Sequence, residues 1–364
     1  MIIIAVILLI PVFSIIIFRI FNANLSKEQK LSRTDRFFKE NKSIFSGFAE
    51  IYSEGGNLLH RCEKNMKEND SFFIASITKL YTHALIYILA DEGKITLDDR
   101  ISQILPENVW QGINVKDRED FSAQITIKHL LDQNAGLPDY EAERINDEDS
   151  LMHRLILEDF SLSPSEIIEI ARKFNGRSKP GGSKSHYCNL NAVLLGMIIE
   201  EKAGMPLQTA MEKYIFTPLE LKETRAVSAD EKIIPFYFVK HKLKRVEYMK
   251  SVFAAGGLVS TNKDIFRFLQ AFFTGQLFSV QHIKNPKFRP IQFIPLEYGA
   301  GMMRMKLSFL ISPFIDCPEI IGHSGMTGSF AFYCPKRKLY IIGTTNQIKP
   351  QPFKIIYKYL DALS

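Results

Sequence analysis

The sequence is poor in the residue patterns that bind metals. It has four cysteines in 364 residues, and none lies close enough to another for a CxxC pair or a zinc site: Cys62, Cys188, Cys317 and Cys334. Its eight histidines include no HExxH motif, so we expect neither a metal nor another cofactor. Because a chain of this length does not need disulfides to stabilise a core, the cysteines are predicted to be free thiols.

A nucleic-acid-binding surface is also missing. The net formal charge is +6, but the basic residues are scattered among acidic ones, with no arginine and lysine stripe interleaved with aromatics. We therefore expect no nucleic-acid partner. With 46% hydrophobic and 24% charged residues, the composition is that of a globular protein with a substantial core. The acidic run from Asp139 to Asp149 is interpreted as a solvated loop without chemistry.

The first 18 residues, MIIIAVILLIPVFSIIIF, lack charged side chains altogether. As a helix they would span about 27 Å, close to the hydrocarbon thickness of a bilayer. We predict a membrane anchor or signal segment over residues 1–20 and a juxtamembrane linker over 21–42. The segment neither begins with basic residues nor ends in small ones, which favours an uncleaved anchor; if it is cleaved, the protein is secreted.

The charges that follow this segment bear on its orientation. They are Arg19, Lys27, Lys30, Arg33 and Arg36. By the positive-inside tendency they favour a cytoplasmic position for the rest of the chain.

The order of strand and helix signals predicts one sheet interrupted by helices. FSGFAEIYSEGGNLLHRCE predicts two strands around the turn Glu54-Gly-Gly56. Apolar residues recur at helical spacing from Ile77 to Leu89, which predicts a buried helix. Helices dominate from about 94 to 250, after which strand signals return before a final helix, PFKIIYKYLDAL. The expected fold class is α/β of the α+β type: an antiparallel sheet flanked by helices, with a helical insertion.

A serine followed three residues later by a lysine occurs twice, at Ser76-Ile-Thr-Lys79 and Ser260-Thr-Asn-Lys263. The first lies at the start of the predicted buried helix, where free N–H groups and the helix dipole favour developing negative charge. The second follows the strand signal AAGGLVST and is interpreted as helix capping by Thr261 or Ser260. Only the first is a candidate catalytic pair.

A serine hydroxyl needs a base before it can act as a nucleophile. A lysine can serve only where its charged form is disfavoured, as in an apolar helix. Catalysis also needs a second proton-transfer group and oxyanion donors. The candidate stretches are Tyr187-Cys188-Asn189, just before a predicted helix, and His323-Ser324-Gly325, between strand signals.

In this order the three motifs resemble those of the serine β-lactamase and penicillin-binding protein superfamily, which begin with SxxK. The sequence is most similar to the branch with class C β-lactamases, DD-peptidases, D-aminopeptidases and related esterases, where YxN is second and KTG or HxG third. The resemblance covers about residues 45–346 and includes ITIKHLLDQNAGLPDY. It implies a β-lactamase-like serine hydrolase domain over 43–364, with a helical subdomain at about 94–250.

The resemblance implies the catalytic roles. Ser76 would be the acylated nucleophile, with Lys79 as its proton acceptor or electrostatic activator and Tyr187 as a further acid or base. The backbone N–H groups of Ser76 and Met326 would form the oxyanion hole. Which group is the main base stays open. No counterpart to the class A deacylating glutamate is recognised, so deacylation is expected to use Tyr187 and Lys79.

It also implies the substrate contacts. Asn189 would hydrogen-bond the substrate amide, His323 would replace the KTG lysine, and Gly325 would let the strand backbone approach the substrate. A histidine with an ordinary pKa of about 6.5 is mostly neutral at neutral pH, so it attracts a substrate carboxylate less than a lysine does. An esterase or D-amino-acid peptidase is therefore favoured over a true β-lactamase, with a small-molecule or peptide substrate.

Two other functions compete with this hypothesis. An α/β-hydrolase elbow, GxSxG, would need glycine at Met326. A catalytically inactive, membrane-anchored ligand-binding pseudoenzyme would not need Ser76, Lys79 and Tyr187 together. Relatives that act on the cell wall work outside the cytoplasm, so a membrane-anchored, extracytoplasmic position, periplasmic or at the cell surface, is favoured despite the charge bias.

Overall fold

Strands from both ends of the chain form one antiparallel sheet of eight strands. The structure is a computed structural model, which describes residue 19 and residues 22–144, 149–228, 233–308, 311–348 and 352–364. In spatial order the strands are β10 (Arg289–Pro290), β11 (Glu297–Gly299), β12 (Met302–Met305), β13 (Ile320–Ser324), β14 (Ser329–Cys334), β15 (Leu339–Thr344), β1 (Gly47–Ser53) and β2 (Leu58–Lys64).

The predicted hairpin and the joining of the two chain ends are both confirmed. β1 and β2 pair around the Glu54-Gly-Gly56 turn, where Gly56 has a φ of 90°, and β1 also pairs with β15 from Phe48 to Ser53. β15 is buried throughout because successive side chains point to opposite faces, and both faces are covered. Tyr340 and Ile342 belong to the core on the helical side, whereas Ile341 belongs to the opposite core.

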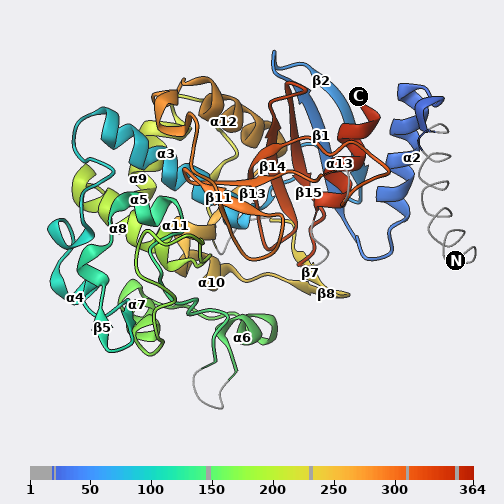
Figure 1. Cartoon of the computed structure of the whole chain (residues 1–364). Coiled ribbons are helices and arrows are strands. Elements are labelled where there is room, and N and C mark those ends of the chain that lie inside the picture. Colours follow the sequence, from blue (N-terminus) through green and yellow to red (C-terminus); the bar gives the residue numbers. More distant parts are fainter. Residues whose placement is uncertain (1–18, 20–21, 145–148, 229–232, 309–310, 349–351) are drawn as a thin grey trace, which may run out of the picture.

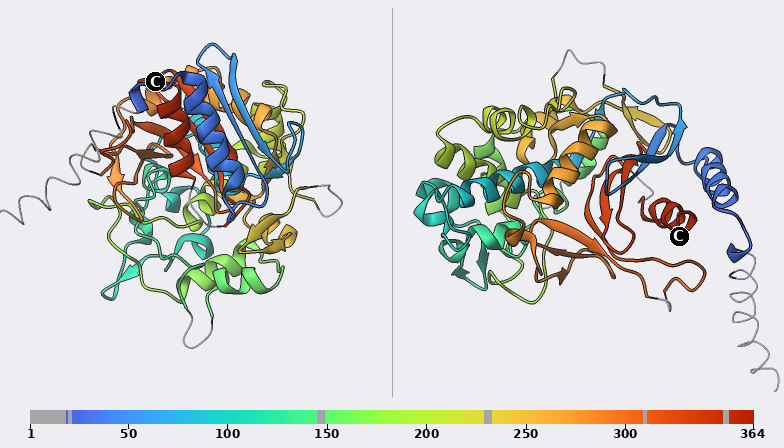
Figure 2. Two further views of the ribbon diagram at one scale, coloured as in Figure 1. Left: turned by 90° about the vertical axis from the view of Figure 1, so that its right-hand side faces the viewer. Right: turned by 90° about the horizontal axis from the view of Figure 1, so that it is seen from above.

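Two helices cover the outer face of the sheet: α2 (Lys27–Glu40) and α13 (Phe353–Ala362). They lie side by side across the strands (Figures 1 and 2). Leu31 and Phe38 of α2 are buried in the same core as Ile356 of α13. The segment that we interpreted as a linker, 21–42, therefore contributes a docked helix to the domain. Its Ser26 cap and the helical spacing of its buried residues were the overlooked signals.

The remaining helices lie on the inner face and beside the sheet (Figure 1). They are α3 (Thr78–Asp91), α4 (Glu107–Trp110), α5 (Ile127–Leu131), α6 (Leu151–Leu157), α7 (Pro164–Arg172), α8 (Leu190–Ala203), α9 (Leu207–Met211), α10 (Val246–Ser251), α11 (Phe253–Gly256) and α12 (Asn262–Thr274). The 3₁₀ turns are η1 (Ala75–Ile77), η2 (Ile101–Gln103), η3 (Ser122–Gln124) and η5 (Val280–Ile283), and η4 (Glu212–Phe216) is a π-helical turn.

Short strands accompany these helices. β3 (Phe72–Phe73), β9 (Leu258–Ser260) and β6 (Arg225–Ala226) form one small sheet; β4 (Val115–Lys116) pairs with β5 (Glu119–Asp120), and β7 (Phe236–Phe238) with β8 (His241–Leu243). The predicted buried helix is α3, which is buried from Thr78 to Leu89. All four cysteines are free and buried, as predicted.

The predicted anchor over 1–20 lies outside the described residues, apart from Arg19. Within the described ranges, no helix combines the length and apolarity needed to cross a bilayer.

Candidate active site

Ser76 lies in the tight turn η1, directly before α3. The residue before it, Ala75, has a φ of 45°, in the left-handed region that non-glycine residues seldom adopt. Such backbone strain is found preferentially at functional sites. The turn leaves the side chain of Ser76 half-buried at the edge of a cavity, whereas its neighbours on both sides are buried.

Lys79 is fully buried beneath Ser76 and has three hydrogen-bond partners. Its Nζ lies 3.0 Å from Ser76 Oγ, 2.6 Å from Asn189 Oδ1 and 2.8 Å from the carbonyl oxygen of Ala255. Two of these partners, the amide and carbonyl oxygens, can only accept a hydrogen bond. Ser76 can either donate or accept.

This arrangement suits a neutral amine. A neutral lysine has two N–H groups and one lone pair, so it can donate to Asn189 and Ala255 while the lone pair faces the hydroxyl of Ser76. Burial lowers the pKa of Lys79 to about 7, although the nearby carboxylates of Glu141 and Asp139 favour its charged form. A substantial fraction of Lys79 can therefore accept the serine proton at neutral pH.

Tyr187 lines the same cavity as Ser76. Its hydroxyl is near enough to the Ser76 side chain for that side chain to influence its pKa, and Lys79 Nζ lies 5.1 Å from the centre of its ring. Burial raises the pKa of Tyr187, and the nearby Ser76 side chain only partly offsets that effect. The phenol is therefore protonated near neutrality and is suited to donate a proton.

Asn189 occupies the residue before α8, yet its side chain does not cap that helix. Its Oδ1 accepts from Lys79, and its Nδ2 donates to Glu141 Oε2 at 2.7 Å. The preceding turn is fixed by buried Gln133, whose Oε1 accepts from the backbone of Cys188. Asn189 thus links Lys79 to a carboxylate.

His323, in β13, is buried behind the cavity and not part of its lining. Its Nε2 lies 3.2 Å from the hydroxyl of Tyr298, and its Nδ1 lies 2.8 Å from the carbonyl oxygen of Ser324. Burial, reinforced by the positive charge of Lys79, holds the pKa of His323 well below its ordinary value. The imidazole is therefore neutral, and Ser324 and Gly325 line the cavity in its place.

Gly325 is required by the turn that carries the nucleophile. A Cβ at this position would come within 2.7 Å of the carbonyl oxygen of Ile74 and 2.9 Å of the Cβ of Ala75. Ser329 adds a hydrogen bond of 2.7 Å to that same carbonyl oxygen. The β13–β14 turn is therefore held against η1, and Met326, in this turn, lines the cavity together with Ser76. The oxyanion hole expected from the backbone N–H groups of Ser76 and Met326 stays a prediction.

The cavity at Ser76 has a volume of about 180 Å³ and continues into a larger space. Asp139, Tyr187, Gln292 and Phe293 line both this cavity and a neighbouring one of about 550 Å³. The two cavities are therefore adjacent, and the space beside the serine extends beyond the position of a reacting bond.

Two carboxylates in this site were missed in the sequence. Glu141 is 5% exposed and lines the cavity with Asp139. Burial and the charge of Glu141 raise the pKa of Asp139 to about 6. The start of the acidic run is thus part of the site, and interpreting it as a solvated loop was wrong at these positions. The sequence signal was their adjacency to GLPDY, where Glu141 directly follows Tyr140.

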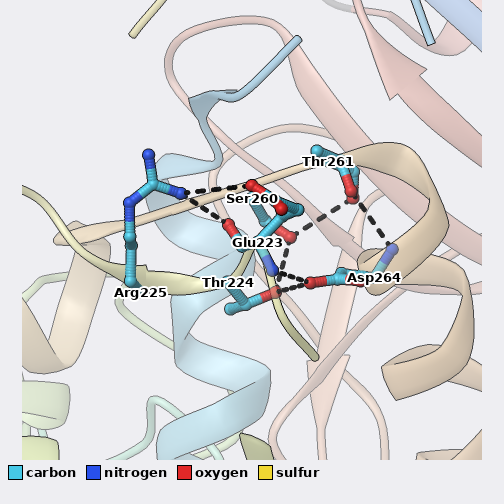
Figure 3. Close-up of polar contacts among 6 residues, drawn as sticks. All are labelled: Glu223, Thr224, Arg225, Ser260, Thr261 and Asp264. Atoms are coloured by element: carbon cyan, nitrogen blue, oxygen red, sulfur yellow. Dashed lines mark hydrogen bonds and ion pairs between the residues drawn. The ribbon is translucent and has the colours of Figure 1, made fainter. Parts of the chain in front are cut away.

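The second SxxK motif is structural, as predicted. Thr261 caps α12 by accepting a hydrogen bond from the backbone N–H of Asp264. Ser260 is buried, and its hydroxyl lies 2.8 Å from that of Thr224, which also donates to Asp264 (Figure 3). Ser260 is thus held in a polar cluster of its own and does not line the cavity at Ser76.

Comparisons with known proteins bear on the family of the chain. The model of the Beta-lactamase family matches residues 38–363. Penicillin-binding protein 4* of Bacillus subtilis (strain 168) is 26% identical over 316 residues, which cover 78% of this chain and 63% of that protein. A putative D-alanyl-D-alanine carboxypeptidase of Escherichia coli (strain K12) is 24% identical over 350 residues, covering 85% of this chain and 76% of that protein.

A solved structure supports the same fold. The D-amino acid amidase of Ochrobactrum anthropi SV3, complexed with D-phenylalanine, matches with a TM-score of 0.72 at 20% identity, covering 92% of this chain and 98% of that one. This chain spans less than two thirds of the length of the Bacillus relative.

The two SxxK motifs provide a matched test of the nucleophile. We expect Ser76→Ala to abolish hydrolysis of an aryl ester while changing the free energy of unfolding by about 1 kcal/mol or less. Ser260→Ala should lower stability by about 1 kcal/mol, because it removes a buried hydrogen bond, and should leave the hydrolysis rate unchanged. Equal loss of activity in the two variants would refute the assignment of Ser76.

The pKa of Lys79 generates a pH prediction. If the neutral amine is the base, the acylation rate should rise with pH through about 7 and then level off. Burst kinetics with a nitrophenyl ester measure this rate. Tyr187→Phe should lower the plateau by about 10²-fold and keep the rise near pH 7, whereas Lys79→Ala should remove the rise. A rise that persists in Lys79→Ala would mean that another group is the base.

Proposed function

The chain belongs to the Beta-lactamase family, and we propose that it is a serine hydrolase that cleaves an ester or amide through an acyl-enzyme on Ser76. The observation that carries the proposal is the set of contacts at Lys79. A fully buried amine with two obligate acceptors and one hydroxyl is arranged to take a proton from that hydroxyl.

The proposed acylation uses groups that already touch. Lys79 accepts the proton of Ser76, and the serine oxygen attacks the substrate carbonyl carbon. The resulting oxyanion is stabilised by the backbone N–H groups of Ser76 and Met326. Tyr187, protonated and in the same cavity as Ser76, donates a proton to the leaving group as the carbonyl bond to it breaks, and is reprotonated by Lys79.

Deacylation would run through the same groups in reverse. Water takes the place of the leaving group, and neutral Lys79 removes its proton, directly or relayed through the Tyr187 hydroxyl, as the water attacks the acyl carbon. The ester bond to Ser76 then breaks, and the serine oxygen regains a proton from Lys79. This route needs no separate deacylating carboxylate.

The charge of the cavity bears on the substrate. Among the described residues that line the cavity at Ser76, none is a lysine, arginine or histidine, while Asp139 is ionised above about pH 6. The basic residues Arg177, Lys184 and His186 line only the neighbouring cavity, away from the reacting bond. Neutral His323 provides no compensating charge. A carboxylate beside the reacting bond would meet repulsion. We therefore propose neutral esters, or amides and peptides of D-amino acids without a carboxylate at that position, as substrates, and not β-lactams.

Relative rates on two chromogenic substrates test this charge argument. We expect a nitrophenyl ester to be hydrolysed much faster than nitrocefin, which carries a carboxylate. Asp139→Asn should raise the nitrocefin-to-ester rate ratio several-fold at pH 8, because it removes a negative charge and keeps the side chain's shape. The ester serves as the internal control. Equal wild-type rates on both substrates, or a ratio unmoved by the substitution, would contradict the argument.

A binding module without turnover is the competing hypothesis. A fluorophosphonate probe separates the two, because only an activated serine is phosphonylated. Labelling that is lost in Ser76→Ala and retained in Ser260→Ala supports the hydrolase. Absence of labelling in the wild-type protein would favour the pseudoenzyme.

For localisation we propose that residues 1–20 anchor the domain on the extracytoplasmic side of a membrane. The support is the uncharged run of 18 residues. We expect externally added protease to digest the domain in intact spheroplasts, with a cytoplasmic protein as the protected control. Full protection of the domain would instead agree with the basic residues that follow the segment.

A further inference from the structure

A buried carboxylate lies at the end of a hydrogen-bonded chain that leads to the nucleophile. Glu141 Oε2 accepts from Asn189 Nδ2 at 2.7 Å, Asn189 Oδ1 accepts from Lys79 Nζ at 2.6 Å, and that Nζ is 3.0 Å from Ser76 Oγ. None of the mechanistic steps proposed above moves a proton to Glu141. Its burial and its position at the end of this series of hydrogen bonds indicate that it has a role in the site.

The surroundings of Glu141 consist of donors. The hydroxyls of Tyr140 and Tyr248 both donate to Oε1, and burial raises the pKa of each phenol well above its ordinary value. With both phenols protonated and Asn189 on the other oxygen, the carboxylate accepts three hydrogen bonds. The backbone of Glu141 is fixed as well, because its N–H donates to Asp139 Oδ1 and its carbonyl oxygen accepts from the N–H of Met152.

We propose that Glu141 is a positioning residue that sets the orientation of the Asn189 amide and thereby directs the lone pair of Lys79 toward Ser76. The inference rests on the proposed function of Ser76 and Lys79 and adds a residue to it. Glu141 acts through Asn189 and does not touch the reacting atoms.

The orientation of the Asn189 amide is fixed by which of its neighbours can donate a hydrogen bond. A carboxylate has no proton to give, so only the NH₂ end of the Asn189 amide can face Glu141. The oxygen end must then face Lys79, which has to donate to it. Ala255 O takes the second N–H of the neutral amine. The only direction left for the lone pair is toward Ser76.

Replacing the carboxylate of residue 141 by an amide removes the requirement that the NH₂ end of Asn189 face it. In Glu141→Gln, the amide oxygen is expected to stay with the two tyrosine hydroxyls, which places the NH₂ group against Asn189. Asn189 then turns its own oxygen toward residue 141 and its NH₂ toward Lys79. The lone pair of Lys79 becomes the acceptor for Asn189 and is lost to Ser76.

The substitution also removes a charge near Lys79. The other titratable groups that face Lys79 are Asp139, Tyr187, Cys188, His83 and His323. Asp139 and Glu141 favour the ammonium form, so loss of either charge lowers the pKa of Lys79. The acylation rate should then begin to rise at a lower pH. The shift of the rise reports the charge of Glu141 near Lys79, whereas loss of the plateau that depends on Asn189 reports the positioning role.

The test is the pH profile of acylation with a nitrophenyl ester. Glu141→Gln should lower the plateau about tenfold or more and move the rise about one pH unit toward lower pH. Glu141→Asp keeps the charge but shortens the side chain, so its rise should stay at the wild-type pH with a reduced plateau. Glu158→Gln, an exposed carboxylate paired with Arg154, is the matched control and should change neither quantity.

A double variant tests the route through Asn189. In an Asn189→Ala background, Glu141→Gln should no longer lower the plateau, although it should still move the rise. An unreduced plateau in Glu141→Gln overturns the proposal, as does an additive loss of the plateau in the double variant. If Glu141→Gln does not fold, a wild-type plateau in Glu141→Asp overturns it.

Failure of the inference and failure of the proposed function give different results. No burst with the wild-type enzyme on any ester would refute the hydrolase itself. A normal wild-type burst with an unreduced plateau in Glu141→Gln would refute only the role of Glu141.

Discussion

The burial of one lysine amine is the constraint on which the site depends. Removing a charged ammonium from water costs several kcal/mol unless its hydrogen bonds are satisfied or it loses its proton. In this protein the Nζ of Lys79 has a partner in each direction, two of them oxygens that cannot donate. Burial is therefore tolerated, and the proton that remains is weakly held. Burial destabilises the charged form of Lys79, and for the same reason it lowers the pKa of the amine and allows it to act as a base.

Three helices meet to provide these partners. Lys79 lies in the first turn of α3, with Ser76 in η1 directly before it; Asn189 directly precedes α8, and Ala255 is in α11. Each of these three helices packs against the other two. Close packing at this junction requires small residues, and a hydrogen bond between two of the helices holds them together. A Cβ at Gly196 of α8 would lie 2.8 Å from Ala254, whose carbonyl oxygen accepts a hydrogen bond from Thr82 of α3. The geometry around Lys79 is thus set by helix packing far more than by the local SxxK sequence.

This explains which features could be predicted from the sequence. Hairpin, strand and helix signals are local, so the sheet and α3 were predictable, as was the separation of Ser76 from Ser260 by what precedes each serine. The docking of α2 was missed because a polar helix shows its tertiary partner only through a few buried positions such as Phe38. The carbonyl oxygen of Ala255 has no side-chain signature at all. Glu141 looked like part of a solvated acidic run, because its partners, Tyr248 and Asn189, are distant in sequence.

The amide between Lys79 and Glu141 has a physical consequence of its own. A direct ion pair between a buried lysine and a glutamate would stabilise the ammonium form and hold the proton on the amine at neutral pH. Asn189 separates the two groups while preserving a hydrogen bond to each. The carboxylate then orients the network and partly opposes the effect of burial, which still lowers the pKa of Lys79 to about 7. A neutral spacer thus lets one acid and one base remain buried together without the acid cancelling the function of the base.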